Sequence, residues 1–288
     1  MQLSVIVPVF DHWDLVPNLL HCIQQQTISP SEFEVILVDN GSTVFNPPKI
    51  LPDNTFVLKA ETPGSYAARN HGAAYAHGEY MVFTDADCLP KPDWLSNFQR
   101  IVQSLTYQSQ ILAGRVEVTS ISSNPNIWEI YDIVKGIPQE QYVLRGYGAT
   151  ANLLIPKLVF DKLGGFDSKR YSSGDAELCR RAGAQGYSIS LVSKAIVQHP
   201  ARNTWPALVT KTRRLKGGQL RNGSLSSRLI WLMRLFKSLP VTPINFMLDR
   251  RHPIKYRVSA SIVYLALWVV EIQEAIKLLI FQSVPERR

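Results

Sequence analysis

The chain has 288 residues, enough for one large domain, or a domain with an appendage, to bury a hydrophobic core. Hydrophobic residues make up 45% and charged residues 19%, which excludes a disordered or collagen-like protein. The net charge of +8 is uneven: residues 1–199 carry 15 Lys and Arg against 19 Asp and Glu, a net −4, whereas residues 200–288 carry 16 against 4, a net +12.

The cysteines and the amino-terminal stretch both bear on the compartment. Cys22, Cys88 and Cys179 lie far apart and form no CxxC pair, which argues against a zinc knuckle or a disulfide framework. The apolar stretch 3–10 is only eight residues long and follows no basic segment, so we expect a strand there and not a signal peptide. These features predict a cytoplasmic protein.

The first part of the chain alternates between strand and helix patterns. Residues 3–10 and 33–38 are rich in β-branched side chains and predict parallel strands buried on both faces. Residues 14–26, between them, have apolar side chains at helical spacing, so the three segments predict a right-handed βαβ unit. A third strand is predicted at 55–58, followed by a helix at 64–78 whose small residues allow close packing.

Carboxylates are predicted where two strands end. Asp39 follows the second strand, and Asp85 and Asp87 follow the bulky run 80–83. Residues i and i+2 of an extended chain point to the same side, about 7 Å apart, so one hard cation can be engaged by both. Because open α/β sheets bind ligands at the carboxyl ends of their strands, the pattern favours a metal and ligand site. A solvated turn is the alternative, since Asp is common where strands end.

Arg69 is the only permanent cation in the predicted helix 64–78. Its planar guanidinium suits a diphosphate or the edge of a base. The alternative is an ordinary surface arginine on a helix.

Short motifs in a fixed order connect this chain to a known family. They are VIVPVF at 5–10, VDNGS at 38–42, GSYAARNHG at 64–72, FTDADCLPKPDWL at 83–95, LGGFD at 163–167 and GDAELCRR at 174–181. With these motifs the chain resembles the inverting glycosyltransferases of family 2, over roughly residues 3–215. The resemblance implies a GT-A type α/β fold, in which a nucleotide-binding mixed sheet is flanked by helices. It also implies a nucleotide-sugar donor and a divalent metal.

The resemblance implies roles for individual residues. The residues implied to border the donor nucleotide are Pro8, Val9, Asp39, Arg69 and, near the ribose, Asp85. Asp87 would bind the metal, Mn²⁺ or Mg²⁺, and His199 matches a histidine that some members use as an additional ligand. A hard cation on carboxylates stabilises a leaving diphosphate without proton transfer, which supports this assignment independently. A histidine at a strand end can equally be structural.

Asp175 matches the general base that takes a proton from the acceptor hydroxyl. The alternative is that Asp175 only caps the helix that begins beside it. Two positions depart from the family pattern: Gly174 stands where Glu is usual, and Asn40 stands where many relatives have Asp, which keeps an acceptor and loses the charge. Asn152 lies in a small-residue turn like the one near the donor sugar, and is predicted to contact the sugar or the acceptor.

The run 210–218 places four cations in six positions. It resembles a basic loop that folds over the diphosphate in relatives, which makes Arg213 and Arg214 predicted diphosphate contacts. A solvated charge run is the alternative.

Two apolar segments with basic flanks follow, at 229–237 and 258–270. A membrane span needs about 20 apolar residues, whereas residues 261–270 supply ten. Extending the span to Phe281 would place Glu271 and Glu274 in the hydrocarbon, so a span is disfavoured. Basic and aromatic flanks predict helices that lie in the interface of an anionic leaflet. The alternative is a helical cap on the catalytic domain or on another subunit. No nucleic-acid partner is expected, because no recognition module accompanies the charge.

The sequence thus predicts a GT-A catalytic domain at 1–215 and a basic, amphipathic, helical region at 216–288 on the inner face of the cell membrane. The predicted activity is metal-dependent transfer of sugar from a nucleotide-sugar donor, with UDP favoured, to a polysaccharide or lipid-linked acceptor. One alternative is a non-catalytic membrane-surface or partner-binding protein that retains the fold. The other is a sugar-phosphate nucleotidyltransferase, which expects a glycine-rich loop after the first strand, where this chain has Val-Phe-Asp-His at 9–12.

Overall fold

The computed structural model describes residues 2–104, 109–170, 172–221 and 225–280. The chain divides into two compact units. The first comprises Met1–Glu117, Ile137–Lys169 and Gly174–His199, and the second comprises Val118–Gly136, Arg170–Ser173 and Pro200–Arg288. Residue 215, where the sequence predicts a domain boundary, lies inside helix α8.

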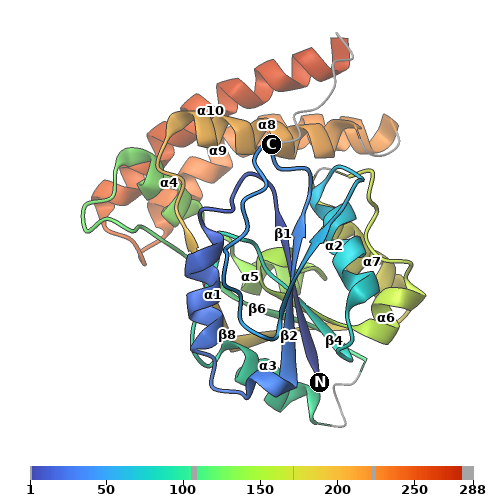
Figure 1. The fold of residues 1–288 in the computed structure, drawn as a ribbon. Coiled ribbons are helices and arrows are strands. Elements are labelled where there is room, and N and C mark those ends of the chain that lie inside the picture. The colour runs from blue at the N-terminus through green and yellow to red at the C-terminus, as the bar shows by residue number, and fades with distance from the viewer. Residues whose placement is uncertain (1, 105–108, 171, 222–224, 281–288) are drawn as a thin grey trace. The chain divides into compact units, whose positions relative to one another are not determined.

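The first unit is built on one mixed sheet. In the described residues the sheet has eight strands in the order β3-β2-β1-β4-β7-β6-β8-β5 (Figure 1). The strands are β1 (Leu3–Val9), β2 (Phe33–Asp39), β3 (Thr55–Lys59), β4 (Tyr80–Phe83), β5 (Leu89–Pro90), β6 (Ile111–Thr119), β7 (Leu153–Pro156) and β8 (Ile189–Pro200). Strands β1 to β4 pair in parallel, while β7 is antiparallel to β4 and β6, and β5 is antiparallel to β8. This arrangement confirms the predicted fold class.

Helices cover both faces of the sheet because the strands are apolar on both sides. Val35 and Leu37 of β2 enter one core, and Ile36 and Val38 enter the other. Helices α1 (Val16–Gln24) and α3 (Trp94–Val102) pack on the first core, whereas α2 (Ser65–Tyr75), α6 (Lys157–Lys162) and α7 (Gly174–Ala184) pack on the second. Figure 1 shows α1 on one side of the central strands, and α2 and α7 on the other.

The small residues of α2 let this helix approach the sheet closely, as predicted. A Cβ at Gly72 would lie 2.8 Å from a methyl of Ile6 and 2.9 Å from a methyl of Val38, closer than carbon atoms tolerate. Glycine at position 72 therefore brings the backbone of α2 close to β1 and to the end of β2. Arg69, one turn earlier on α2, is thereby held near the same end of the sheet.

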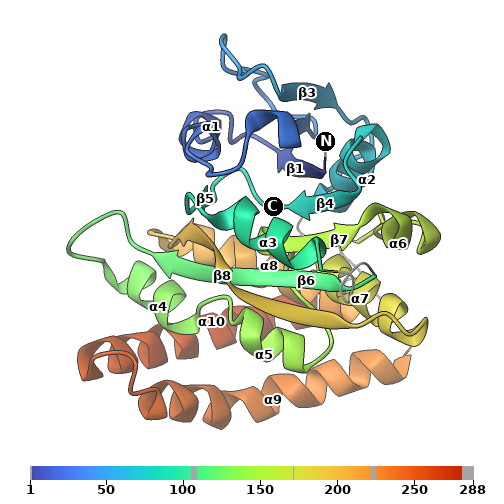
Figure 2. The ribbon, with the colours of Figure 1, turned by 90° about the horizontal axis from the view of Figure 1, so that it is seen from below.

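The described residues of the second unit are mainly helical. They include α4 (Ile127–Lys135), α8 (Trp205–Arg221), α9 (Leu225–Leu248) and α10 (Ile254–Ile280), and α10 packs against the other three (Figure 2). The basic run 210–218 lies within α8, so the predicted loop there is wrong. The two glycines in the run do not end the helix, and Gly218 allows close packing, because a Cβ there would lie 1.8 Å from Ser172 Oγ. No described helix is long and apolar enough to cross a bilayer.

Candidate active site

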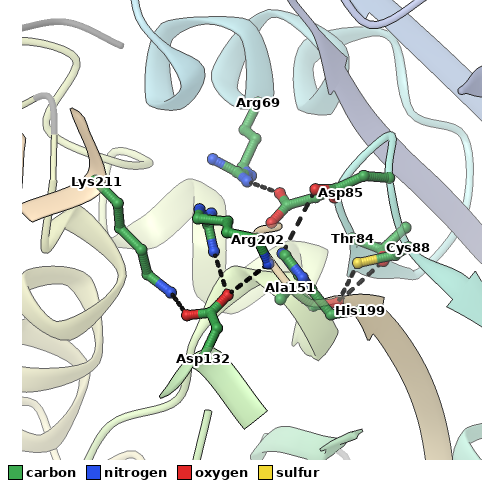
Figure 3. A network of polar contacts seen from close by, with 10 residues as sticks. Arg69, Thr84, Asp85, Cys88, Asp132, Ala151, His199, Arg202 and Lys211 are labelled. Carbon is green, nitrogen blue, oxygen red and sulfur yellow. Dashed lines mark hydrogen bonds and ion pairs between the residues drawn. The ribbon is translucent and has the colours of Figure 1, made fainter. Parts of the chain in front are cut away.

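Strand β4 ends in a short turn that carries two carboxylates. Thr84 is fully buried, and its hydroxyl donates to the carbonyl of Ala151 at 2.9 Å, which fixes the start of the turn (Figure 3). The Cys88 N–H donates to the carbonyl of Asp85 at 3.1 Å and closes the turn. The side chains of Asp85 and Asp87 remain 33% and 27% exposed, so both can reach a ligand.

A short strand pairing brings His199 to these carboxylates. Strand β5 follows the turn and pairs antiparallel with the end of β8, so that Leu89 lies opposite Gln198. His199 Nε2 is consequently 3.5 Å from Asp87 Oδ2, and the histidine is only 5% exposed. The register of two strands far apart in the chain thus assembles the cluster that the sequence predicts.

Asp85, Asp87 and His199 fit a divalent cation. Each offers one ligand atom, and these three atoms lie within 4.8 Å of one another. Carboxylate oxygens suit Mg²⁺ and Mn²⁺, while an imidazole nitrogen suits the transition metals. The donor set therefore fits a divalent metal ion.

Arg69 lies beside the same turn. Its Nη2 donates to Asp85 Oδ1 at 2.5 Å, and the arginine is 4% exposed (Figure 3). Its Nε is buried and makes no hydrogen bond to any residue that the structure describes. A buried guanidinium with an unused donor is costly without a ligand, so the site suits an anionic or hydrogen-bonding partner. Asp85 is thus engaged by both a fixed cation and the candidate metal cluster.

Asp39 ends β2 opposite Val9, whose neighbour Pro8 lies opposite Val38. Its carboxylate accepts from the Trp13 indole N–H at 2.9 Å and from the backbone N–H groups of Gly41 and Ser42 at 3.2 and 3.3 Å. These donors orient a carboxylate that is 5% exposed. Pro8, Val9 and Asp39 therefore lie together at the adjacent ends of β1 and β2; their position beside a nucleotide base stays a prediction.

Asn40, the substituted position next to Asp39, has a structural use. Its Nδ2 donates to the carbonyl of Thr62 at 2.7 Å, and its Oδ1 accepts from the Gly64 N–H at 2.6 Å. An amide supplies both a donor and an acceptor, which an ionised Asp cannot. Asn40 therefore ties the end of β2 to the start of α2.

Asp175 lies in the first turn of α7 and is held by three donors. Its Oδ1 accepts from the Tyr66 hydroxyl at 3.2 Å and from the Ala176 N–H at 2.8 Å, and its Oδ2 accepts from the Thr150 N–H at 3.3 Å. Burial raises the pKa of Asp175, and these donors, together with nearby Arg69, oppose that shift. A raised pKa improves a carboxylate as a proton acceptor near neutral pH.

Gly174 leaves space for the Tyr66 ring. A Cβ at position 174 would lie 2.7 to 2.9 Å from three ring carbons of Tyr66. Tyr66 is buried and also packs against Phe166, at 5.2 Å between ring centroids. The departure from the usual Glu at 174 thus accompanies a tyrosine that contacts Asp175.

Comparison with known proteins agrees with this geometry. The model of a family described as Glycosyl transferase family 2 matches residues 4–164. The chain is also 31% identical over 225 residues to glycosyltransferase AglE of Haloferax volcanii, covering 75% of this chain and 72% of the relative. The chain belongs to glycosyl transferase family 2.

Solved structures of GT-A glycosyltransferases share the fold. The mannosyltransferase PcManGT of Pyrobaculum calidifontis, solved with GDP-Man and Mn²⁺, aligns with a TM-score of 0.59 at 17% identity, covering 98% of this chain and 88% of that one. S. aureus TarS 1-349, solved with UDP-GlcNAc, aligns with a TM-score of 0.55 at 17% identity, covering 96% and 81%. At this identity the likeness establishes the fold.

Within this family 2 chain, Asn152 does not fit its predicted contact with a sugar or acceptor. The residue is fully buried. Its Oδ1 accepts from the Trp94 indole at 2.8 Å, and its Nδ2 donates to the carbonyls of Arg115 and Ala195, both at 2.9 Å. Both amide hydrogens are used, so Asn152 ties α3 to β6 and β8. A polar residue in a motif-like turn looked like a ligand contact because its burial is invisible in the sequence.

Arg213 and Arg214 lie on α8 in the second unit. Arg213 is 3.9 Å from the buried Glu274 carboxylate, and the backbone carbonyl of Arg214 accepts from Ser172 Oγ at 3.3 Å. Their contact with a diphosphate stays a prediction. The same helix contributes Lys211, which binds the buried Asp132 at 2.9 Å (Figure 3).

Two residues of the site were not predicted from the sequence. Tyr66 contacts the candidate base, and Trp13 orients Asp39. Tyr66 lies within the GSYAARNHG motif, so its position next to Arg69 was a usable signal. For Trp13 the only signal was a position soon after the first strand.

Proposed function

We propose that this family 2 glycosyltransferase transfers a sugar, with inversion, from a nucleotide-sugar donor in a divalent-metal-dependent reaction. The observation that carries the proposal is the convergence of Asp85, Asp87 and His199 within 4.8 Å at the end of β4. Because a leaving nucleotide diphosphate accumulates negative charge, such a cluster is the feature that this reaction needs.

The reaction proposed is a direct displacement. An acceptor hydroxyl oxygen attacks the anomeric carbon and forms the new glycosidic bond, while the bond from that carbon to the diphosphate oxygen breaks and its electron pair leaves with the nucleotide. The Asp175 carboxylate takes the hydroxyl proton. A single displacement from the face opposite the leaving group inverts the anomeric configuration. Support for this role comes from the fixed carboxylate and from burial, which raises the pKa of Asp175.

We propose the donor contacts that the family resemblance implies. Pro8, Val9 and Asp39 border the base, Arg69 meets the nucleotide, and Asp85 lies near the ribose. Asp87 and His199 would hold Mn²⁺ or Mg²⁺, which supplies charge neutralisation to the leaving diphosphate. Arg213 and Arg214 are retained as proposed diphosphate contacts.

We propose UDP as the donor nucleotide, in line with the UDP-GlcNAc bound by TarS. The GDP-Man bound by PcManGT makes GDP the alternative to test. We also propose a polysaccharide or lipid-linked acceptor, and a peripheral location on the inner face of the cell membrane. The basic, apolar surface of the second unit supports that location.

The test is release of nucleotide diphosphate from UDP-glucose, UDP-GlcNAc and GDP-mannose, with Mn²⁺ or with EDTA. We expect release from at least one donor with Mn²⁺, little with EDTA, and a large loss in Asp175→Asn, which keeps the shape and removes the base. Asp161→Asn, at an exposed carboxylate on α6, is the matched control. Full activity of Asp175→Asn with every accepted donor would refute the base assignment.

A further inference from the structure

The surface of the second unit is positively charged because its acidic side chains are turned inward. The carboxylates in the described part of this unit belong to Glu129, Asp132, Asp249, Glu271 and Glu274. Three are less than 10% exposed, and the side chains of Asp249 and Glu271 are each 16% exposed. Where the structure describes side-chain exposure on α9, α10 and the loop between them, the exposed Lys and Arg are Arg234, Lys237, Arg250, Arg251, Lys255 and Lys277, of which Arg251 pairs with Asp249.

Each of those carboxylates already has a partner. Asp132 binds Arg202 at 3.1 Å and Lys211 at 2.9 Å, and Glu271 binds Lys216 at 3.0 Å. Glu274 pairs with Arg213, Asp249 pairs with Arg251, and Glu129 accepts from Ser120 at 2.7 Å. In the described part of this unit, no exposed carboxylate remains to balance the surface cations.

Helix α10 combines this charge with an exposed apolar stripe. Its members follow one another at intervals of three, four or seven residues, so they line one side of the helix: Val258, Ile262, Leu265, Val269, Ile276 and Leu279. They are 39–57% exposed. The other exposed positions from 258 to 276, Ala266 and Gln273, are uncharged.

Helix α9 packs beside α10 and adds to the apolar surface (Figure 2). Met233, Phe236, Ile244 and Leu248 are 54–71% exposed, while Arg234 and Lys237 are exposed near its middle. Large exposed apolar surfaces on soluble proteins mark interaction sites.

Two partners could cover this apolar surface, a second copy of the chain or a membrane, and the surface charge favours the membrane. In a dimer through α10, the cations of one copy would face those of the other, and the carboxylates needed to offset them are already paired. An anionic membrane supplies both partners, because its phosphates attract the cations and its headgroup region accepts the apolar side chains. We propose that the exposed side of α9 and α10 lies on the surface of an anionic lipid bilayer without crossing it. This rests on the proposed peripheral location and assigns it to named residues.

The test is co-sedimentation of the full chain with vesicles, without donor or acceptor, so that it does not depend on the proposed reaction. One set of vesicles is phosphatidylcholine, and the other is an equimolar mixture of phosphatidylcholine and phosphatidylglycerol. We expect binding to the mixed vesicles that weakens as salt is raised, and much weaker binding to phosphatidylcholine alone.

Two variants separate the apolar and charged contributions. The double variant with Ile262→Gln and Val269→Gln should bind the mixed vesicles more weakly, by roughly fivefold for each substitution. Each side chain is about half exposed, so membrane binding can bury about half of its surface, and burying a whole side chain of this kind is worth ~1.5–3 kcal/mol. Lys255→Gln should weaken it by a similar factor, because a cation near an anionic surface contributes about 1 kcal/mol. Leu158→Gln, at an 80% exposed residue of α6 in the first unit, is the matched control and should bind like the wild type.

Light scattering of the same proteins without lipid measures their mass in solution and therefore tests whether a second copy of the chain covers the surface instead. The proposal would be overturned if the wild type did not bind vesicles and instead formed a dimer, and if the double variant with Ile262→Gln and Val269→Gln were a monomer. Equal binding to both kinds of vesicle would also overturn it, because the cations would then have no role. Thermal unfolding that matches the wild type verifies that each variant is folded.

Discussion

Replacing Tyr66 with Phe should change how the activity depends on pH. The substitution removes the hydroxyl that donates to Asp175 Oδ1 at 3.2 Å and keeps the ring that packs against Gly174. The Ala176 and Thr150 N–H groups continue to hold the carboxylate. The variant therefore removes one stabilising contact of the ionised base with little change in its position.

The size of the effect follows from that contact. A hydrogen bond to a charged group is worth ~1.5–3 kcal/mol, and a distance of 3.2 Å favours the lower end. Because the bond stabilises the carboxylate, its loss raises the pKa of Asp175 beyond the increase that burial already causes. A change of ~1.4 kcal/mol is a factor of ten, so activity on the acidic side of the profile should fall about tenfold, with little change at alkaline pH.

The assay is release of nucleotide diphosphate across pH with an accepted donor, and Tyr75→Phe at an exposed residue of the same helix is the control. A carbon-13 NMR titration of the Asp175 carboxyl, assigned with Asp175→Asn, gives the same quantity in the ligand-free protein. If the Tyr66→Phe profile overlays that of the wild type in both experiments, Tyr66 does not tune the base and this reasoning is wrong.

Other predictions concern the metal cluster and two buried polar residues. Asp87→Ala should abolish the dependence of activity on Mn²⁺, whereas Asp85→Ala should mainly raise KM for the donor; equal effects in metal and donor titrations would contradict this division. Gly114→Ala should cost about 3 kcal/mol in denaturant unfolding, because its Cβ would lie 2.2 Å from Asn152 Nδ2 and disrupt buried hydrogen bonds; unchanged stability would be unexpected. Asp132→Asn should cost about 3 kcal/mol at neutral pH, because it leaves the partly buried Arg202 and Lys211 without their anionic partner. Burial raises the pKa of Asp132, but the neighbouring Lys211 and Arg202 lower it further, so that the net pKa is below the usual value. The ionised carboxylate therefore stabilises the fold fully above pH about 4, the usual pKa of Asp. The difference in unfolding free energy between the wild type and Asp132→Asn should become smaller as the pH falls below that value.

The features that were predictable from the sequence are those with local patterns. The strands at 3–10 and 33–38 are signalled by runs of β-branched residues, and the turn with Asp85 and Asp87 by a bulky run that stops at two carboxylates. The antiparallel strands were less accessible, because their pairing joins segments far apart in the chain. The resemblance to family 2 gave the fold class, which the structure and the comparisons confirm.

The errors and omissions arose where burial decides a role. The sequence shows Asn152 as a polar residue in a loop, but its amide is buried and bonded to a helix and two strands, α3, β6 and β8. The basic run 210–218 resembles a loop of relatives, yet it lies within α8, where Gly218 packs against Ser172. Tyr66 was missed because its hydroxyl meets a carboxylate 109 residues later. In each case the deciding contact lies outside the local sequence.

The most direct test of a metal-dependent nucleotide site is thermal unfolding with UDP, GDP or dTDP, each with and without Mn²⁺. At a concentration 100-fold above Kd, a ligand of the folded state should raise Tm by roughly 4 °C for a chain of this size. We expect UDP to do so only with Mn²⁺, and Asp87→Ala to lose that increase. No increase with any of the three nucleotides, or the same increase without the metal, would contradict the account.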